Sequence, residues 1–196
     1  LTPQISPTPE QLVVVQPTAT PTATLEPTSD TLAFDQFVQS VTNGSASSRV
    51  GVYVENLFSL PIIQQPSNDP GWITSNFGEV TEFRIVRQHT GNEGLIAHNY
   101  LAGGQFYSLQ IGDIAELVLG DGSVIEFEIY AIEQYQALTP NSPTSDFLDL
   151  ATGDKLSASD LFFRVYGGHM TLTFQTCINR DNISTWGRTF IIGEEL

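Results

Sequence analysis

The sequence predicts a mainly β domain preceded by an extended segment that is rich in proline and threonine. Two observations support this prediction. Six of the eleven prolines lie within residues 1–30, together with a dense run of threonine. From about residue 30 onward, short apolar or alternating runs recur and are broken by Gly, Pro, Asn and Asp. About eight such runs in roughly 165 residues are typical of a closed barrel or a sandwich, and the pattern alone does not separate these two folds.

Residues 1–30 are expected to form an extended linker or stalk, because proline fixes φ and removes hydrogen-bond donors. We interpret this segment as a spacer that holds a domain away from a surface; a disordered tail without a mechanical role is the alternative. The apolar stretch LVVV at 12–15 could dock as a strand or in a groove. Residues 31–196 are long enough for one domain of ordinary size.

The first element after the linker is predicted to be a short helix. In SDTLAFDQFVQSV, Ser29 or Asp30 can serve as the N-cap, and apolar residues follow at helical spacing. Strands are expected, in order, at RVGVYVENL, SLPIIQQ, EFRIVRQ, GLIAHN, LFFRVY, MTLTFQT and RTFIIGE. The stretch DIAELVLGDGSVIEFEIYAIEQY predicts a hairpin, because Gly and Asp in GDGS accept positive φ in tight turns.

Composition excludes several classes of protein. The 22 acidic residues against seven basic ones give a net charge of −15, which argues against nucleic acid and anionic membrane surfaces as partners. The single cysteine rules out an internal disulfide, and no Cys/His cluster offers a structural zinc site. No stretch approaches the roughly 18 apolar residues of a membrane span. Because the sequence begins with Leu, we expect a signal peptide or membrane anchor to have been removed upstream.

The only cysteine, Cys177, ends the stretch TFQTC. A free cysteine is commonly a small buried hydrophobe, so core packing is one interpretation. The other is a nucleophile, because Cys177 lies where a predicted strand gives way to the polar loop INRDNISTWG, and loops carry function. If the protein is extracellular, an unpaired thiol is retained mainly for its reactivity. A cysteine nucleophile needs a base or proton donor and a group that stabilises the oxyanion.

Three histidines and seven cations are available for those roles. His98 follows the apolar GLIA and leads into NYLAGG, so it is a plausible base at a strand end; a buried, hydrogen-bonded histidine is the alternative. Arg188 is expected to begin a strand that anchors it beside the cysteine strand, and Arg180 is its rival. His89 and His169 are expected at surface turns. The remaining arginines are expected in or beside strands and have no motif support: Arg49, Arg84, Arg87 and Arg164.

Four stretches after the linker resemble the sortases, cysteine transpeptidases of mainly Gram-positive cell envelopes, and they occur in the family's order. TFQTC is similar to the sortase TLxTC motif, with Phe174 at the usual Leu position and Thr173, Thr176 and Cys177 matching. GNEGLIAHN resembles the stretch that ends in the family's catalytic histidine, which identifies His98.

The other two stretches follow the same order. AGGQFYSLQIGDIAELVLGDGSVIEFEIYAI is similar to the sortase segment after that histidine: a small-residue loop, a helical turn, a Gly-Asp step and a hairpin. GRTFIIGEEL resembles the strand that opens with the catalytic arginine, which identifies Arg188.

This resemblance implies a closed eight-stranded sortase-like barrel with short helices over residues 31–196. It implies a transpeptidase that cleaves the sorting signal of a secreted protein through a Cys177 thioester and transfers the protein to an amine, either a cell-wall precursor or a pilin lysine. Thr173, Phe174 and Thr176 are expected to contact substrate. The domain is expected at the extracellular face of the envelope, tethered through a segment missing from this chain, and as a monomer. The stretch from residue 137 to 168 corresponds to the loop that helps read the sorting signal, and it carries no recognisable subclass signature.

The resemblance requires no cofactor. Some sortases bind calcium through loop carboxylates, and acidic residues are available here, but no EF-hand-like spacing occurs, so a solvated acidic surface is the favoured interpretation. The residues concerned are Glu79, Glu82, Glu93, Asp146, Asp149 and Asp154. Two other functions stay open: a catalytically idle sortase-like binding module, and a cysteine peptidase that only hydrolyses.

Overall fold

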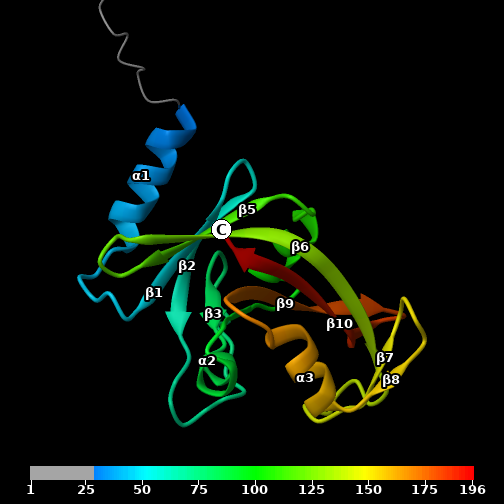
Figure 1. The fold of residues 1–196 in the computed structure, drawn as a ribbon. Coiled ribbons are helices and arrows are strands. Elements are labelled where there is room, and N and C mark those ends of the chain that lie inside the picture. The colour runs from blue at the N-terminus through cyan, green and yellow to red at the C-terminus, as the bar shows by residue number, and fades with distance from the viewer. Residues whose placement is uncertain (1–28) are drawn as a thin grey trace, which may run out of the picture.

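One sheet of ten strands closes on itself in the computed structural model, which describes residues 29–196 (Figure 1). The strand order is β10-β9-β4-β3-β2-β1-β5-β6-β7-β8, and an additional pairing of β10 with β6 closes a ring of eight strands. Strands β7 and β8 extend β6 outside that ring. The predicted closed, eight-stranded, mainly β barrel is therefore confirmed. The predicted linker and the LVVV stretch lie outside the described residues.

The elements have the following bounds. The barrel strands are β1 (Arg49–Val54), β2 (Phe58–Gln64), β3 (Val80–Glu82), β4 (Glu93–Ile96), β5 (Ile114–Leu119), β6 (Val124–Ala137), β9 (Thr171–Arg180) and β10 (Ile183–Glu195). The outer strands are β7 (Phe147–Asp149) and β8 (Lys155–Leu156). The helices are α1 (Ser29–Val41), α2 (Arg84–Thr90), the 3₁₀ helix η1 (Ala102–Ser108) and α3 (Ala158–Tyr166). None of the helices in residues 29–196 combines the length and the apolarity that a membrane crossing requires.

Alternation along the strands builds two hydrophobic cores, because successive side chains point to opposite faces of a sheet. One set of side chains fills the barrel, and the other set lies between the outer face of the sheet and helices α2 and α3. The barrel core includes Val52, Leu95, Phe106, Leu172, Phe174 and Ile191. The outer core includes Val86, Tyr135, Leu161, Val165, Tyr166, Phe190 and Ile192.

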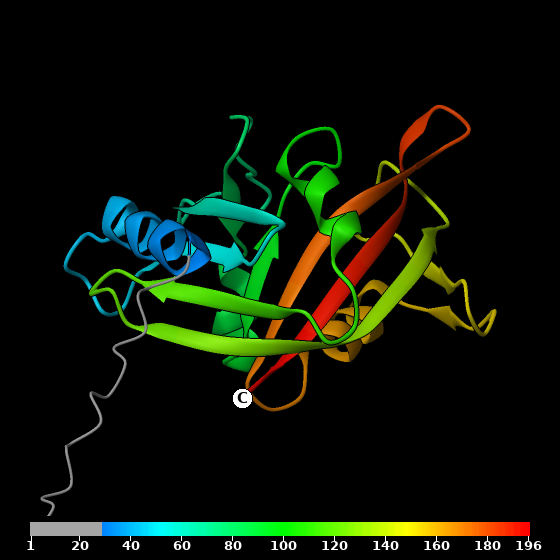
Figure 2. The ribbon, with the colours of Figure 1, turned by 90° about the horizontal axis from the view of Figure 1, so that it is seen from above.

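Helix α1 is the predicted first helix, and it packs against β1. Phe34 and Phe37 lie against the ring of Tyr53, with centroids 5.0 and 6.2 Å apart. A Cβ on Gly51 would be 2.8 Å from the Phe37 ring, so the absent side chain lets the helix approach the strand. In both views α1 lies at the end of the molecule opposite the β9–β10 hairpin (Figures 1 and 2).

Two predicted strands are wrong. The stretch EFRIVRQ ends β3 and then forms α2, and LFFRVY is the body of α3. In α3 the Ser157 side chain accepts a hydrogen bond from the backbone N–H of Asp160, which is an N-cap. Helix α2 ends at Gly91, whose φ of +79° suits glycine at the end of a helix. A short apolar run is compatible with either a strand or a buried helix, and the residues at the helix ends indicate the helix here.

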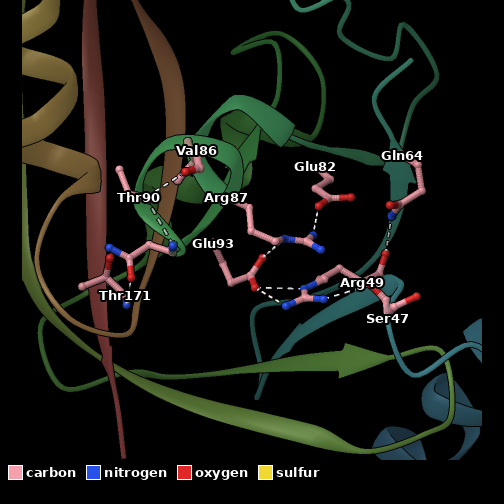
Figure 3. A network of polar contacts seen from close by, with 10 residues as sticks. Ser47, Arg49, Gln64, Glu82, Val86, Arg87, Thr90, Glu93 and Thr171 are labelled. Atoms are coloured by element: carbon pink, nitrogen blue, oxygen red, sulfur yellow. Dashed lines mark hydrogen bonds and ion pairs between the residues drawn. The ribbon is translucent and has the colours of Figure 1, made fainter. Parts of the chain in front are cut away.

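A buried ionic network joins α2 to three barrel strands (Figure 3). Glu93 is 7% exposed and pairs with Arg49 at 2.9 Å and with Arg87 at 3.4 Å. Glu82 is 4% exposed and also pairs with Arg87. Buried carboxylates require such partners. The favoured interpretation of these glutamates as a solvated acidic surface is therefore wrong. It is also wrong for Asp149, which is buried and pairs with an arginine of α3 at 3.0 Å.

Candidate active site

The three predicted catalytic residues lie on one face of the sheet, two on neighbouring strands and His98 just beyond the end of β4. Cys177 in β9 and Arg188 in β10 are directly opposite each other in the antiparallel ladder. Parallel pairing of β4 with β9 places Ile96 beside Gln175, and Ala97 N–H then donates to the Gln175 carbonyl at 3.2 Å. His98 follows Ile96 by two residues, just beyond the end of β4. All three line the same cavity, on the outer face of the barrel.

His98 is half-buried just beyond the end of β4. Its ring stacks on the exposed ring of Tyr100, with centroids 5.1 Å apart and planes 16° apart. Its backbone carbonyl accepts hydrogen bonds from the N–H groups of Leu101 and Gly103 at 2.9 and 3.1 Å, which fix the turn that follows. Burial lowers the pKa of His98, because desolvation disfavours the imidazolium. The neutral ring is therefore the favoured form near neutral pH.

Arg188 is held by its own strand. Its Nη1 donates to the carbonyls of Thr185 and Gly187 at 3.0 and 2.9 Å. No carboxylate pairs with Arg188 among residues 29–196. In a chain of net charge −15, this leaves a positive group available to an external ligand. Arg188 lies within β10, which begins at Ile183, so the expectation that it opens the strand is corrected by five residues.

An apolar pocket opens beside these residues. Its volume is about 280 Å³, close to the lower end of the range for ligand pockets, roughly 300–1,000 Å³. Its walls come from the β2–β3 loop, the β6–β7 loop, the first residue of β7 and α3. The residues of the walls are Pro70, Gly71, Ile73, Pro143, Phe147, Ala158, Leu161, Phe162 and Val165.

The described residues that line the pocket include no negatively charged side chain. No Asp or Glu is present among its described lining residues, whereas Arg188 and His98 both line it. Tyr166 and Gln175 also line it, and the Tyr166 hydroxyl donates to Oε1 of Gln175. Burial raises the pKa of Tyr166, so its hydroxyl stays protonated as a donor. The pocket therefore combines an apolar wall with a thiol, an imidazole and a guanidinium.

The residues predicted to contact substrate have different positions. Thr176 lines the pocket, and its hydroxyl donates to the Ala97 carbonyl at 3.0 Å. Phe174 is fully buried in the barrel core against the rings of Phe58 and Phe106. Direct contact of Phe174 with substrate is therefore corrected, because a strand residue three positions from Cys177 points to the opposite face.

Thr173 is on the same face as Cys177, but α3 covers it. It is fully buried, and its hydroxyl donates to the Val165 carbonyl at 2.9 Å. The structure gives Thr173 a role in docking α3 on the sheet rather than in contacting a ligand.

The rival catalytic candidates are not brought to the pocket. Arg180 is exposed on the β9–β10 hairpin and lies 4.8 Å from the ring of Trp186. His89 is on α2, where its ring meets Phe162 edge-on. His169 is exposed in the connection from α3 to β9. Within the described part of the chain, no three or more His, Cys, Asp and Glu side chains gather as a metal site would require.

The walls of the pocket and one contact to Cys177 were not predicted from the sequence. The helix signal for α3 was present as Ser157 followed three residues later by Asp160. The contact comes from Tyr107 in η1, whose hydroxyl donates to the Cys177 carbonyl at 2.7 Å. No sequence pattern indicated this hydrogen bond, because the two residues are 70 positions apart.

Comparison with known proteins gives matches among solved structures alone: no protein-family model matches the sequence, and neither does any curated protein. Sortase A of Listeria monocytogenes is 14% identical, with a TM-score of 0.46, covering 79% of this chain and 88% of that one. Sortase C-1 of Actinomyces oris is 15% identical, with a TM-score of 0.46, covering 86% and 83%.

A third structure is sortase C of Clostridium perfringens with the C-terminal cell wall sorting motif. It is 15% identical, with a TM-score of 0.44, covering 79% of this chain and 74% of that one. At these values the likeness carries no argument about activity, so a functional assignment depends on the residues of the pocket. The chain is a closed eight-stranded barrel that is similar to sortases A and C over most of its length.

Proposed function

We propose that this chain is a sortase-type cysteine transpeptidase, with Cys177 as the nucleophile. One observation carries the proposal: Cys177, His98 and Arg188, each identified by its own sequence motif, line one apolar pocket, two of them from neighbouring strands and His98 from just beyond β4. The three motifs come from separate stretches of the chain, so their convergence on one face is not a consequence of their spacing in the sequence.

The proposed reaction begins with attack of the Cys177 Sγ on the carbonyl carbon of a scissile peptide bond. A C–S bond forms, the thiol proton passes to His98, and the carbonyl oxygen becomes negative. Collapse of this intermediate breaks the C–N bond, and His98 gives its proton to the leaving amine. The product is a thioester between Cys177 and the amino-terminal part of the substrate.

In the second half of the reaction an acceptor amine attacks the thioester carbon and gives its proton to His98. The C–S bond then breaks, and the proton returns to the Cys177 sulfur. The lowered pKa of His98 suits this base role, because the neutral ring can accept the proton. Arg188 offsets the charge on the carbonyl oxygen in both halves, since its Nε and Nη2 make no hydrogen bond within the described residues.

The proposed substrate is an extended peptide that places an apolar side chain in the pocket, as the sorting signal of a secreted protein would. The proposed acceptor is an amine of the cell envelope, either a cell-wall precursor or a pilin lysine. Residues 31–196 would act as the catalytic domain, with residues 1–30 as the stalk that holds it at the outer face of the envelope. Because the described lining of the pocket contains no carboxylate, the substrate needs no positive charge near the scissile bond.

Product analysis tests the proposal. The chain is incubated with an LPxT-type peptide, with and without triglycine, and the products are separated by mass spectrometry. A transpeptidase gives the triglycine-joined product when the amine is present, and Cys177→Ala gives none. Cleavage without joining would assign the chain as a hydrolase, and no cleavage with any LPxT-type peptide would favour the idle binding module.

A further inference from the structure

The pairing of β9 with β4 ends at Gln175, two residues before the thiol residue Cys177. Strand β4 ends at Ile96, and the last backbone bond between the two strands runs from Ala97 N–H to the Gln175 carbonyl. Carbonyl groups alternate between the two edges of a strand, so the next one on this edge belongs to Cys177. A backbone carbonyl at a half-buried position requires a donor. The Tyr107 hydroxyl supplies it at 2.7 Å.

The same short helix also fixes His98. Leu101 and Gly103, which begin the η1 segment, donate their N–H groups to the His98 carbonyl. A Cβ on Gly103 would be 2.3 Å from Oγ1 of Thr176, so η1 packs directly on β9 next to the thiol residue. Figure 2 shows this green helical segment beside the orange strand β9. The start of η1 thus holds His98, and Tyr107 near the end of η1 holds Cys177.

Tyr107 contacts the backbone of Cys177 from outside the pocket lining. It is not among the described residues that line the cavity, and its hydroxyl is also a hydrogen-bonding neighbour of the Thr189 side chain. Thr189 is the ladder partner of Thr176, one step along from the pair formed by Cys177 and Arg188. The phenol therefore touches the backbone of the reacting residue without touching the space that a substrate would occupy.

We propose that Tyr107 is a positioning residue that holds Cys177 level with His98, so that the imidazole can activate the thiol. This inference rests on the proposed function. Tyr107→Phe removes one hydroxyl and keeps the ring, so it releases the Cys177 carbonyl while leaving the pocket unchanged. The variant should lower kcat and leave KM unchanged, because no substrate contact is lost.

A double-mutant cycle on thiol alkylation tests the inference. Iodoacetamide reacts with the only cysteine of the chain, so the mass shift reports Cys177 alone. Alkylation rates are measured for the wild type, Tyr107→Phe, His98→Ala and the double variant. Tyr107→Phe should slow alkylation by about tenfold when His98 is present, the effect expected for one hydrogen bond. In the His98→Ala background it should change the rate by less than about twofold, because the two residues act through one contact.

Tyr130→Phe is the matched control. Tyr130 is 46% exposed and Tyr107 is 48% exposed, but Tyr130 lies on β6, away from the cavity lining. Iodoacetamide should alkylate Cys177 of the Tyr130→Phe variant at the wild-type rate. If Tyr107→Phe also matches the wild type, or slows alkylation equally in both backgrounds, the positioning role is wrong while the catalytic pair stands. If His98→Ala alkylates as fast as the wild type, the proposed function itself fails, and this inference fails with it.

Discussion

Cys177 and Arg188 are ladder partners on β9 and β10, with both side chains on the outer face of the barrel. Directly opposite residues of an antiparallel pair have Cβ atoms about 4.5–5.5 Å apart. The backbone of two long strands therefore fixes the distance between the Cβ atoms of Cys177 and Arg188. His98 does not have this support, because β4 ends before it. The histidine depends on the turn and on η1 for its position.

Arg188→Lys should impair turnover without unfolding the protein. The arginine uses Nη1 for two backbone carbonyls and keeps its other nitrogens for a ligand, whereas one lysine ammonium cannot do both from the same position. We expect kcat/KM to fall by about 10²–10³, as for loss of an oxyanion donor. Steady-state kinetics with an LPxT-type peptide measure this. Arg180→Lys, on the exposed hairpin, is the control and should retain wild-type kinetics.

The pH dependence of His98 has a defined sign. Burial lowers its pKa below the ordinary value of 6.5, so the unfolded chain binds this proton more readily than the folded chain. The stability that His98 contributes is present above about pH 6.5 and is lost as the pH falls through its lowered pKa. An NMR titration of the ring, assigned with His98→Gln, should give a midpoint below 6.5. A midpoint at or above 6.5 would contradict the effect of burial.

Gly103→Ala should damage both stability and catalysis. The new methyl group would meet Oγ1 of Thr176 at 2.3 Å and the carbonyls of Ala97 and His98 at 2.6 and 2.8 Å. Overpacking of this kind costs about 1–3 kcal/mol. Urea unfolding should show this loss, and kcat should fall because the His98 turn must shift. Gly71→Ala is the stability control, since the nearest atom to its added methyl group is 3.7 Å away. Equal stability of the two variants would show that η1 can shift at little cost in free energy.

Glu93→Gln tests the buried ionic network of Figure 3. Removing this carboxylate leaves the paired guanidinium of Arg49, and part of that of Arg87, without their partner. Breaking a buried ion pair on one side costs about 3–5 kcal/mol. The midpoint temperature of thermal unfolding should therefore fall strongly. Alkylation of Cys177 well below the melting temperature should stay at the wild-type rate, because Glu93 opens β4 and His98 follows its other end. A small thermal shift would mean that the network is solvated.

Seven of the eight barrel strands could be predicted from alternation, with the hairpin of β5 and β6 predicted from its turn residues, whereas the three-residue strand β3 was not predicted. The helices α2 and α3 could not be assigned from their short apolar runs, which pack against the sheet and resemble strands. The cap at Ser157 and the glycine at 91 carried the signal. The burial of Glu82 and Glu93 in ion pairs with arginines was not predictable, because those arginines come from other elements of the fold.

For the site, the sequence motifs named Cys177, His98 and Arg188, which line one cavity, but they did not give the faces of β9. Strand parity alone separates Phe174 from Cys177, and applying it would have placed the phenylalanine in the barrel. Thr173 shows the limit of parity: it shares the face of Cys177 and is covered by α3. The pocket walls and the Tyr107 contact depend on tertiary packing between distant segments, which local patterns do not specify.

Intact-mass spectrometry tests most directly whether Cys177 is an activated nucleophile. The chain is first incubated with a peptide that mimics an LPxT-type signal and carries a thiol-directed electrophile. Wild type and His98→Ala are compared over the same time course. An activated nucleophile predicts rapid labelling at the single site Cys177 in the wild type and much slower labelling in His98→Ala. Slow labelling at the same rate in both proteins would contradict the account and would identify Cys177 as an idle thiol in a binding module.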